Sequence, residues 1–439
     1  MYIEKITVID APCGGGKTSW AIQMMQEDTE TSFIYCTPFL EEIKRIRKAC
    51  GKYRFYEPRN FGTSKIEDFN ELLAQGKDIA VTHSTFLNAT ATTAELIRQG
   101  EYTMIIDEAL DIIEDFNKVA SVESAVEQSL KSKDIEVMIR DGLISIGENG
   151  LVIWTGKDYQ GTKYSEVERL AKLNRLFYAN NAMLCMFPPE IFQAFQKVYV
   201  MTYLLEGTFI KYYFDLFGIS YEKVTTVKNG ESYELAEYKP DSDHAFRQRC
   251  KELITVCSVY RLNEGYKRTS FSKNWYDNNI GQMEILRRLR TDLTYFFTRH
   301  AKAKSKDILW TCPKKYRQKV QGKGYTCVRQ MTKEENTLHE EQRKEREKEL
   351  TCFIPLNARA TNDYKERWAL AYCFNMYTPT IIQCFFNNCG HPVDGDMFAM
   401  ACFIQWIFRS RIRDGKSIII YLPSPRMRKL FERWLNCDL

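Results

Sequence analysis

The segment Ala11-Pro-Cys-Gly-Gly-Gly-Lys-Thr18 constrains this 439-residue chain more than any other feature. It follows an apolar run, Ile6–Asp10, and precedes a segment of helical character, Ser19–Met25. A glycine-rich loop between a strand and a helix lets backbone N–H groups surround phosphates, and the helix N-terminus adds a favourable dipole. We therefore expect a P-loop that binds ATP through residues Pro12, Cys13, Gly14, Gly15, Gly16, Lys17 and Thr18. Lys17 would reach the β and γ phosphates, and the Thr18 hydroxyl would ligate Mg²⁺.

A P-loop requires a carboxylate at the end of another strand of the same sheet. Tyr102–Leu110 supplies Asp107 and Glu108 directly after an apolar run. We expect Asp107 to hold Mg²⁺ and Glu108 to polarise the attacking water. The two segments together predict an ATP hydrolase that uses ATP and Mg²⁺.

Composition limits the class of protein. The length favours two domains, and the hydrophobic fraction of 44% with a charged fraction of 27% is typical of soluble globular chains. The net charge of +5 permits an acidic partner without identifying one. No pair among the 14 cysteines has Cys-x-x-Cys spacing, which favours free thiols in a reducing compartment. No apolar run is long enough to span a bilayer, so we expect a cytoplasmic protein, in the host cytoplasm if phage-encoded, that does not contact membrane.

Short apolar runs alternate with helical segments, which predicts an α/β fold with parallel sheets. The strands expected in the first domain are Ile6–Asp10, Ser32–Thr37, Ile79–Thr82, Tyr102–Ile106 and Val198–Thr202. Those expected in the second are Leu253–Cys257, Asp307–Thr311, Cys352–Leu356, Thr380–Phe386 and Ser417–Leu422. The predicted domains are 1–205, with a helical insertion at about 111–195, and 206–439, with a charged segment at 314–350. The balance of acids and bases in this segment favours a solvated helix or connection over a nucleic-acid patch.

Asp107-Glu108-Ala109 resembles the Asp-Glu-Ala box of superfamily 2 helicases and translocases. This resemblance implies two RecA-like domains that close on ATP and step along nucleic acid. Tyr35–Phe39 resembles the family's motif Ia, and Val81–Phe86 resembles its next motif. By this resemblance, the residues that would contact nucleic acid in the first domain are Thr37, Pro38, Thr82 and His83. Thr202 stands where the motif that couples hydrolysis to domain closure belongs, although the rest of that motif is absent.

Two segments of the second domain resemble later motifs of the same family. Asn357–Asp363 resembles motif V, and its candidate nucleic-acid contacts are Arg359, Thr361 and Asn362. Gln405–Arg413 resembles motif VI, whose arginines act at the γ-phosphate, so Gln405, Arg409 and Arg413 are candidate catalytic residues. On a helix, Arg409 and Arg413 would share one face, whereas Arg411 would point elsewhere.

The overall pattern looks most like helicase-like proteins of bacteriophages and prophages. It implies movement on DNA, or its unwinding, in phage replication or recombination. The expected partners are single-stranded or duplex nucleic acid, with DNA favoured over RNA, and replication proteins. Some aromatic side chains could stack on bases, and the candidates are Tyr212, Tyr213, Phe271, Trp275 and Tyr276. Most of them are expected to lie in the core instead, given the area that such side chains bury. Two alternatives stay open at this point: a phage packaging-type motor, and a P-loop switch that acts on protein partners.

Overall fold

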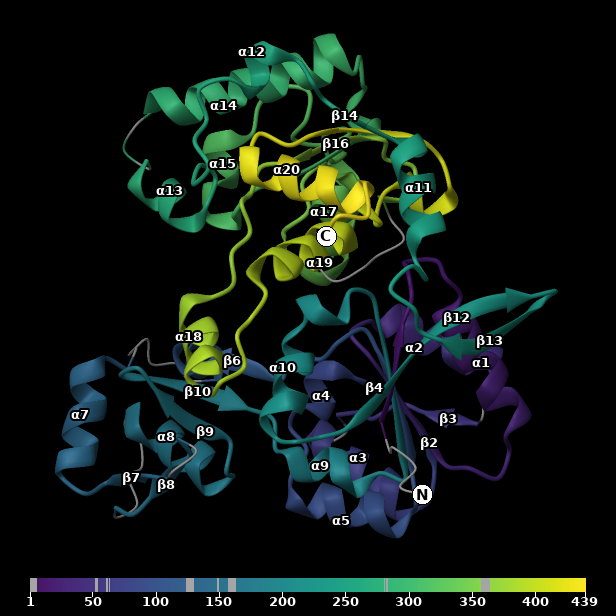
Figure 1. The fold of residues 1–439 in the computed structure, drawn as a ribbon, viewed down its shortest axis with the longest axis vertical. Helices are drawn as coiled ribbons and strands as arrows, with labels where there is room; N and C mark the ends of the chain where they lie inside the picture. The colour runs from purple at the N-terminus through teal and green to yellow at the C-terminus, as the bar shows by residue number, and fades with distance from the viewer. Residues whose placement is uncertain are drawn as a thin grey trace. The chain divides into compact units, whose positions relative to one another are not determined.

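The computed structural model contains two compact units (Figure 1). It describes residues 6–51, 54–60, 62, 64–123, 130–147, 150–156, 163–279, 281, 283–356 and 364–439. Unit 1 comprises Met1–Ala11, Gly15–Tyr238 and Thr378–Asp394, and unit 2 comprises Pro12–Gly14, Lys239–Tyr377 and Gly395–Leu439. The main division therefore falls after Tyr238, later in the chain than the predicted boundary at residue 205.

Unit 1 contains an eight-stranded sheet that is parallel except at one edge. Its order is β13 (Ser232–Glu237), β12 (Tyr221–Asn229), β1 (Ile6–Asp10), β11 (Lys197–Thr202), β5 (Thr103–Asp107), β2 (Phe33–Thr37), β4 (Asp78–Thr82) and β3 (Phe55–Tyr56). The five strands predicted for this domain are all present at these positions. The sequence analysis missed the antiparallel pair β12–β13, which extends the sheet beyond β1.

Helices cover both faces of this sheet, because its central strands are apolar on both sides. One face packs on α1 (Lys17–Glu27) and α2 (Leu40–Ala49), with Ile9, Tyr35 and Ile105 in that core. The other face carries Val8, Ile34 and Ile106. It packs on α3 (Lys65–Ala74), α4 (His83–Phe86), α5 (Ala91–Gln99), α9 (Pro189–Ala194) and α10 (Phe209–Leu216).

Residues between β5 and β11 form a subdomain with its own core. A three-stranded antiparallel sheet joins β6 (Ile113–Asp115), β10 (Ala182–Met186) and β9 (Leu176–Ala179). A hairpin of β7 (Ile144–Ile146) and β8 (Val152–Trp154) accompanies α6 (Phe116–Glu123), α7 (Ser132–Arg140) and α8 (Lys163–Lys172). The predicted insertion is therefore a mixed α and β structure.

Unit 2 contains a four-stranded parallel sheet of order β14 (Ile254–Val256), β17 (Ile418–Tyr421), β16 (Ala369–Tyr372) and β15 (Ile308–Thr311). Three of these strands were predicted, whereas β16 was missed. The predicted strand at Cys352–Leu356 is wrong, since only Phe353 forms an isolated bridge, to Trp310.

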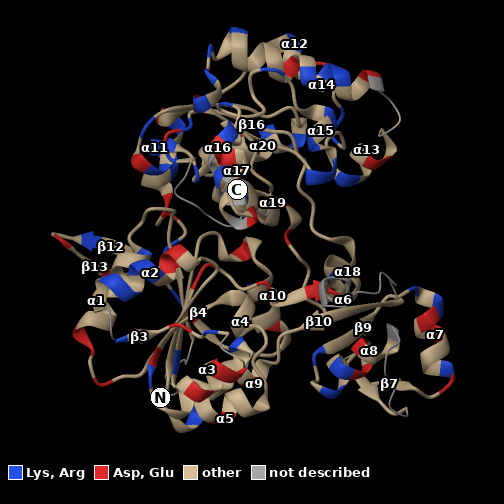
Figure 2. Cartoon of the chain, turned by 180° about the vertical axis from the view of Figure 1, so that it is seen from behind, with Lys and Arg blue, Asp and Glu red and all other residues tan. Residues whose placement is uncertain are grey.

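The helices of unit 2 surround this sheet, and Lys and Arg gather on several of them (Figure 2). They are α11 (His244–Leu253), α12 (Tyr260–Asn263), α13 (Lys273–Asn278), α14 (Met283–Tyr295), α15 (Arg317–Val320), α16 (Lys333–Asn336), α17 (Glu340–Leu350), α19 (Gly395–Ile407) and α20 (Pro425–Leu435). Much of the charged segment 314–350 is helical, and Glu335 within it pairs with Arg329 and Arg346 at 2.7 Å each. Within the described ranges, no helix has the length and apolar character needed to cross a membrane.

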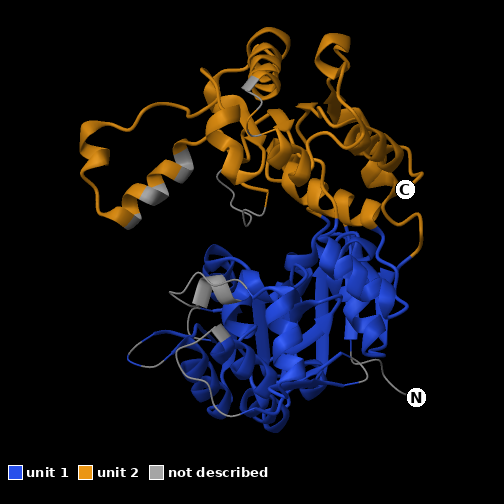
Figure 3. Cartoon of the chain, turned by 90° about the vertical axis from the view of Figure 1, so that its left-hand side faces the viewer, with its two compact units in different colours: residues 1–11, 15–238, 378–394 blue, residues 12–14, 239–377, 395–439 orange. Residues whose placement is uncertain are grey.

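The predicted strand Thr380–Phe386 is instead a helix, α18 (Thr380–Asn388), and it belongs to unit 1 (Figure 3). Ile382, Phe385 and Phe386 lie three and four positions apart, so all three enter the core on one helical face. Phe385 packs edge-on against Phe177 of β9, and Phe386 lies against Tyr212 of α10. A short apolar run does not distinguish a strand from a buried helix, which explains the error.

Because α18 completes the core of unit 1, Phe386→Ala is expected to destabilise that unit by about 3–5 kcal/mol. Urea unfolding would measure the loss, and hydrogen-exchange mass spectrometry would show faster exchange in β9 and α10 as well as in α18. Thr380→Ala, at an exposed position of the same helix, is the control and should change little. Faster exchange confined to α18 would contradict this role.

Candidate nucleotide site

The loop after β1 has the backbone expected of a P-loop. Gly14 and Gly16 have φ angles of +79° and +90°, which side chains other than glycine rarely adopt. Lys17 begins α1, and its Nζ donates a hydrogen bond to the carbonyl oxygen of Ala11. Thr18 follows as the second residue of the helix. The loop and the first turn of α1 therefore present backbone N–H groups of the kind that bind phosphate.

Three neighbouring strands end at the same edge of the sheet as this loop. In the register, Asp10 of β1 pairs with Thr202 of β11, and Met201 of β11 pairs with Asp107 of β5. Asp107 is therefore one strand removed from the P-loop strand, with Thr202 between them. Thr202 is 3% exposed, and its Oγ1 has no hydrogen-bond partner among the described residues. A buried hydroxyl without a protein partner at this edge is suited to a ligand or an ordered water.

Two residues just beyond these strands have strained backbones. Glu108 has φ of +65°, and its N–H donates to the carbonyl of Met201 at 3.0 Å. Leu204 has φ of +60°, and its N–H donates to Asp10 Oδ1 at 2.9 Å. Left-handed conformations in such residues cost about 1–3 kcal/mol, and they occur preferentially at functional sites. The sheet hydrogen bonds hold Glu108 in this conformation beside Asp107.

Asp107 is partly exposed as a residue, and its carboxyl lies in a polar environment. Burial raises the pKa of its carboxyl, while Tyr35, the charge of Lys17 and the Thr37 hydroxyl act in the opposite direction. The interaction with Lys17 connects the acidic strand end with the P-loop. His83 Nε2 hydrogen-bonds to the backbone carbonyl of Asp107 at 3.0 Å, so the motif after β4 also lies against this strand end.

Asp10 is a residue of this site that the sequence analysis missed. It is 4% exposed, and its two carboxylate oxygens accept the N–H groups of Leu204 and Leu205. Lys223 Nζ of β12 lies 3.1 Å from Asp10 Oδ2. Burial tends to lower the pKa of Lys223, but the charges of Asp10, Tyr238 and Glu206 outweigh it and raise that pKa. The available signal was an acid at the end of a largely apolar strand, directly before the glycine-rich loop.

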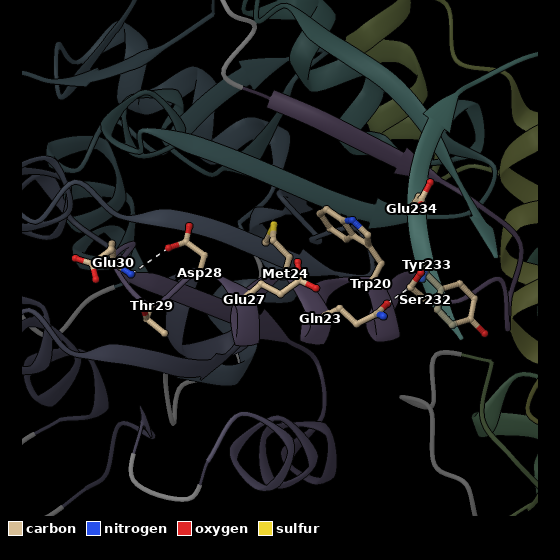
Figure 4. A pocket seen from close by; sticks show the side chains of 10 residues that line it. All are labelled: Trp20, Gln23, Met24, Glu27, Asp28, Thr29, Glu30, Ser232, Tyr233 and Glu234. Carbon is tan, nitrogen blue, oxygen red and sulfur yellow. Dashed lines mark hydrogen bonds between the residues drawn. The ribbon is translucent and has the colours of Figure 1, made fainter. Parts of the chain in front are cut away.

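The hairpin β12–β13 supports the P-loop from the side. Thr226 Oγ1 donates to the carbonyl of Gly15 at 2.7 Å, and the N–H of Tyr233 donates to Gln23 Oε1 at 3.0 Å. A Cβ atom on Gly16 would lie 2.0 Å from the Tyr233 ring, so this position requires glycine for two reasons. A cavity of about 650 Å³ extends along α1 beside the hairpin (Figure 4). It is lined by Trp20, Gln23, Met24, Glu27, Asp28, Thr29, Glu30, Ser232, Tyr233 and Glu234, none of them predicted site residues.

The residues predicted to contact nucleic acid in the first domain differ in exposure. Thr37 is fully buried and His83 is 6% exposed, which favours a role beside Asp107 over contact with a strand. Pro38 and Thr82 are partly exposed, and Thr82 Oγ1 accepts the N–H of Thr85 at the start of α4. In the second domain, Arg359, Thr361 and Asn362 lie outside the described residues.

Most of the aromatic residues proposed for base stacking are buried. Tyr212, Tyr213, Phe271 and Tyr276 are at most 4% exposed, and only Trp275 retains partial exposure. The four buried side chains contribute to the cores of the two units, which confirms the expectation that most of these aromatic residues are core and excludes the four as stacking platforms.

The helical argument for the arginines of unit 2 is also wrong. Helix α19 ends at Ile407, where Gln405 lies in its last turn, and the chain then turns through Ser410, whose buried hydroxyl donates to the carbonyl of Ile407. Arg409 is therefore in a turn, whereas Arg413 lies in the separate 3-10 helix Arg411–Asp414. Arg409 is partly exposed and Arg413 is exposed, but no single helical face joins them.

These features define an α/β protein of two parallel-sheet units in which one unit carries a P-loop and an Asp-Glu strand end. Comparison with known proteins places the chain more closely. Models of the YonV middle domain and the YonV C-terminal Rossmann-like domain match residues 126–186 and 248–435. A relative in Bacillus subtilis (strain 168), the SPbeta prophage-derived uncharacterized protein YonV, is 32% identical over 448 residues, 99% of each chain. The chain belongs to the YonV family.

The similarity to a prophage-derived protein confirms the predicted resemblance to proteins of bacteriophages and prophages. Among solved structures, Xpd4 of S. tokodaii aligns with a TM-score of 0.49 at 14% identity, covering 98% of this chain and 93% of that one. A second structure, described as XPD in its apo form, aligns with a TM-score of 0.49 at 13% identity, covering 99% and 96%. These structural likenesses are weak, and the proposals below rest on this chain's own residues.

Loss of the Asp10 carboxylate would leave two buried N–H groups without their acceptor, and it would leave Lys223 with Glu206 as its remaining carboxylate partner. Asp10→Ala is therefore expected to destabilise unit 1 by about 3–5 kcal/mol, the usual effect of breaking a buried pair. Urea unfolding would measure the loss in the free energy of unfolding, and hydrogen exchange would show that unit 1 is the part that unfolds. Glu41→Ala removes an exposed pair with Lys44 and should change stability by less than about 1 kcal/mol. Equal effects of the two substitutions would contradict the role given to Asp10.

Asp107→Asn is expected to raise the melting temperature at pH 7 in the absence of nucleotide. Because burial raises the folded-state pKa of Asp107, its ionised form destabilises the fold above the unfolded pKa, and this penalty disappears as pH falls through the folded pKa. The difference from wild type should therefore shrink between pH 7 and pH 4 in thermal unfolding.

Asp28→Asn provides a comparison of opposite sign. Hydrogen bonds from the Thr31 hydroxyl and N–H lower the pKa of Asp28, so this carboxylate stabilises the fold at pH 7 and loses that contribution in acid. A melting temperature that falls in both variants at pH 7 would contradict the assignment for Asp107.

Proposed function

We propose that this chain is an ATPase that couples ATP hydrolysis to movement along nucleic acid, or to its unwinding, with DNA as the preferred strand. The observation that supports this most directly is the shared sheet edge. Lys17 and Thr18 follow β1, Asp107 ends β5 and Glu108 comes directly after it, with Thr202 on the strand between β1 and β5. In this arrangement the residues proposed to bind phosphate, hold the metal ion and activate water would act at one edge.

The residues of this edge fit ATP with Mg²⁺. The positive φ angles of Gly14 and Gly16 and the unpartnered hydroxyl of Thr202 are suited to a polar ligand. The backbone of residues 12–16 and Lys17 would hold the phosphates, and Thr18 and Asp107 would hold the metal ion. The bound magnesium would neutralise phosphate charge. Glu108 would accept a proton from water, and its fixed conformation beside Asp107 would orient that water.

Further roles in this proposal come from the second domain. Gln405, Arg409 and Arg413 remain candidates for completing the reaction, without the shared helical face. Arg359, Thr361 and Asn362 remain candidates for binding the strand, together with Pro38 and Thr82 in the first domain. A role in phage replication or recombination, with replication proteins as partners, belongs to the same proposal.

The two alternative functions, a packaging-type motor and a switch that acts on protein, predict different features. A packaging motor would need a cluster of metal-binding carboxylates in the second half, but Asp396 there is paired with Arg426 at 2.5 Å. A switch that acts only on protein would hydrolyse ATP at a rate that nucleic acid does not change. Stimulation of turnover by single-stranded DNA or RNA therefore separates the translocase from the switch.

Lys17→Ala is expected to abolish ATP turnover, and Glu108→Gln is expected to slow it at least about 100-fold while ATP still binds. The reason is that Lys17 neutralises phosphate charge, whereas Glu108 acts on water alone. Phosphate release measures turnover, and a fluorescent ATP analogue measures binding.

Glu27→Gln, at an acid on α1 outside the site, is the matched control and should turn over ATP normally. Unchanged turnover in folded Lys17→Ala protein would refute the ATPase proposal. Loss of ATP binding in Glu108→Gln would refute the role given to that residue.

A further inference from the structure

Positive charge is concentrated in one part of unit 2. Residues 261–323 contain sixteen Lys or Arg and five Asp or Glu, although the whole chain has a net charge of only +5. The remainder of the protein is therefore net acidic. Fourteen of the sixteen basic side chains are exposed, and the other two, Arg290 and Arg317, are partly exposed. None of the motifs discussed above includes these residues.

Packing brings several of these side chains onto neighbouring elements. Helix α14 buries Leu286, Leu289 and Leu293, which share a core with Tyr316 and Val320 at α15. The rings of Tyr276 in α13 and Tyr316 are stacked with centroids 5.0 Å apart. Helices α13, α14 and α15 are therefore adjacent, and together they carry more Lys and Arg than Asp and Glu (Figure 2). We define the basic surface as six basic side chains of α13, α14, α15 and the 3-10 turn before α15: Lys273, Arg287, Arg290, Lys314, Lys315 and Lys319. Arg288 and Arg317 are not included, because Arg288 pairs with Asp292 and Arg317 lies over the ring of Phe353.

The acidic residues of this region do not neutralise it. Asp292 is buried, accepts a hydrogen bond from Tyr266 and offsets Arg288, whose Nε lies 3.7 Å from it. Asp277 accepts a hydrogen bond from the Tyr316 hydroxyl and lies 3.4 Å from Lys315, and the charge of Lys273 also acts on it. Glu284 is the one acid on the exposed side of α14 within the described residues. By contrast, α17 alternates both signs along its length, as a solvated helix does. An unbalanced excess of exposed positive charge favours an anionic partner.

Aromatic side chains at the edge of this surface indicate the kind of anion. Tyr260 of α12 is 75% exposed, which is unusual for a side chain of its size. The adjacent Arg261 lies over the ring of Tyr295 in α14, 4.6 Å from its centroid, so α12 adjoins the basic surface. Basic groups that follow a backbone, with an exposed ring for base stacking, are the features that bind single strands. A duplex or an anionic membrane presents no free base to such a ring.

We infer that the basic surface of α13, α14 and α15 binds the sugar-phosphate backbone of single-stranded nucleic acid, with Tyr260 stacking on a base. This inference rests on the proposed function and adds to it a binding surface outside the helicase-like motifs. The contacts are to phosphates, so binding depends weakly on sequence and strongly on salt.

The test is the triple variant Lys273→Gln, Arg287→Gln, Lys314→Gln, which removes one charge from each of three elements. Its matched control is Lys65→Gln, Lys133→Gln, Lys429→Gln, which removes three exposed charges elsewhere. Fluorescence anisotropy with labelled single-stranded DNA and, separately, RNA of the same sequence would give affinity over a range of salt. A plot of log affinity against log salt has a negative slope, and each contact to a single strand contributes about −0.7 to it. In the triple variant this slope should therefore become shallower by about 2.

Tyr260→Ala should lower affinity about 5- to 150-fold with an unchanged salt slope, because only stacking is lost. ATP turnover without nucleic acid should be normal in all these variants, and its stimulation by single strands should fall in the triple variant. The strand that loses more affinity in the triple variant, DNA or RNA, identifies the preferred ligand.

An unchanged slope in the triple variant, or an equal loss in the control, would overturn the inference. Binding of wild type to phosphatidylserine vesicles that the triple variant loses, without a loss of strand binding, would overturn it in favour of a membrane. Failure of the proposed ATPase function can be told apart from failure of this inference, because it would appear as ATP turnover that persists in Lys17→Ala. Wild-type ATPase activity without any strand binding at low salt would remove the binding surface and leave the ATPase.

Discussion

The buried carboxylate of Asp10 is the interaction on which the nucleotide edge depends. It accepts two backbone N–H groups from the chain after β11 and pairs with Lys223 of β12. One side chain thus connects the P-loop strand with its neighbours on both sides. A charge this deeply buried is stable only when its partners satisfy it, so its geometry also fixes theirs. The P-loop consequently begins from a rigid strand end.

The strained residues of the site are stable because of this support. Leu204 adopts its left-handed conformation while hydrogen-bonded to Asp10, and Glu108 adopts the same conformation while hydrogen-bonded to β11. On the other side of the loop, the ring of Tyr233 packs against Gly16 and Thr226 binds the carbonyl of Gly15. The hairpin that provides both contacts lies beyond the boundary predicted from sequence. The loop after β1 and the hairpin that supports it therefore come from segments more than 200 residues apart.

The two units are also interdependent along the chain. Helix α18 is flanked in sequence by segments of unit 2, yet its Phe385 and Phe386 complete the core of unit 1. The N–H of Asp394 at the end of this excursion donates to the hydroxyl of Tyr212 in α10. Unit 1 is therefore complete only after residue 394 has been synthesised. Such non-local contacts slow folding, because a long loop must close before they form.

The sequence alone determined the α/β class, the five strands it predicted in the first sheet, the P-loop, and the pairing of that loop with Asp107 and Glu108. These features are local: glycine conformation, strand periodicity and a strand-loop-helix context can each be recognised within about ten residues. The roles given to Glu108, Arg409 and Arg413 remain predictions. Tertiary structure decided what depends on partners distant in sequence. It made Thr380–Phe386 a helix, buried Thr37 and the aromatic residues, ended α19 before Arg409, and gave Asp10 its partners. Burial and hydrogen bonding depend on which segments meet, and a short apolar or charged run does not specify its partner.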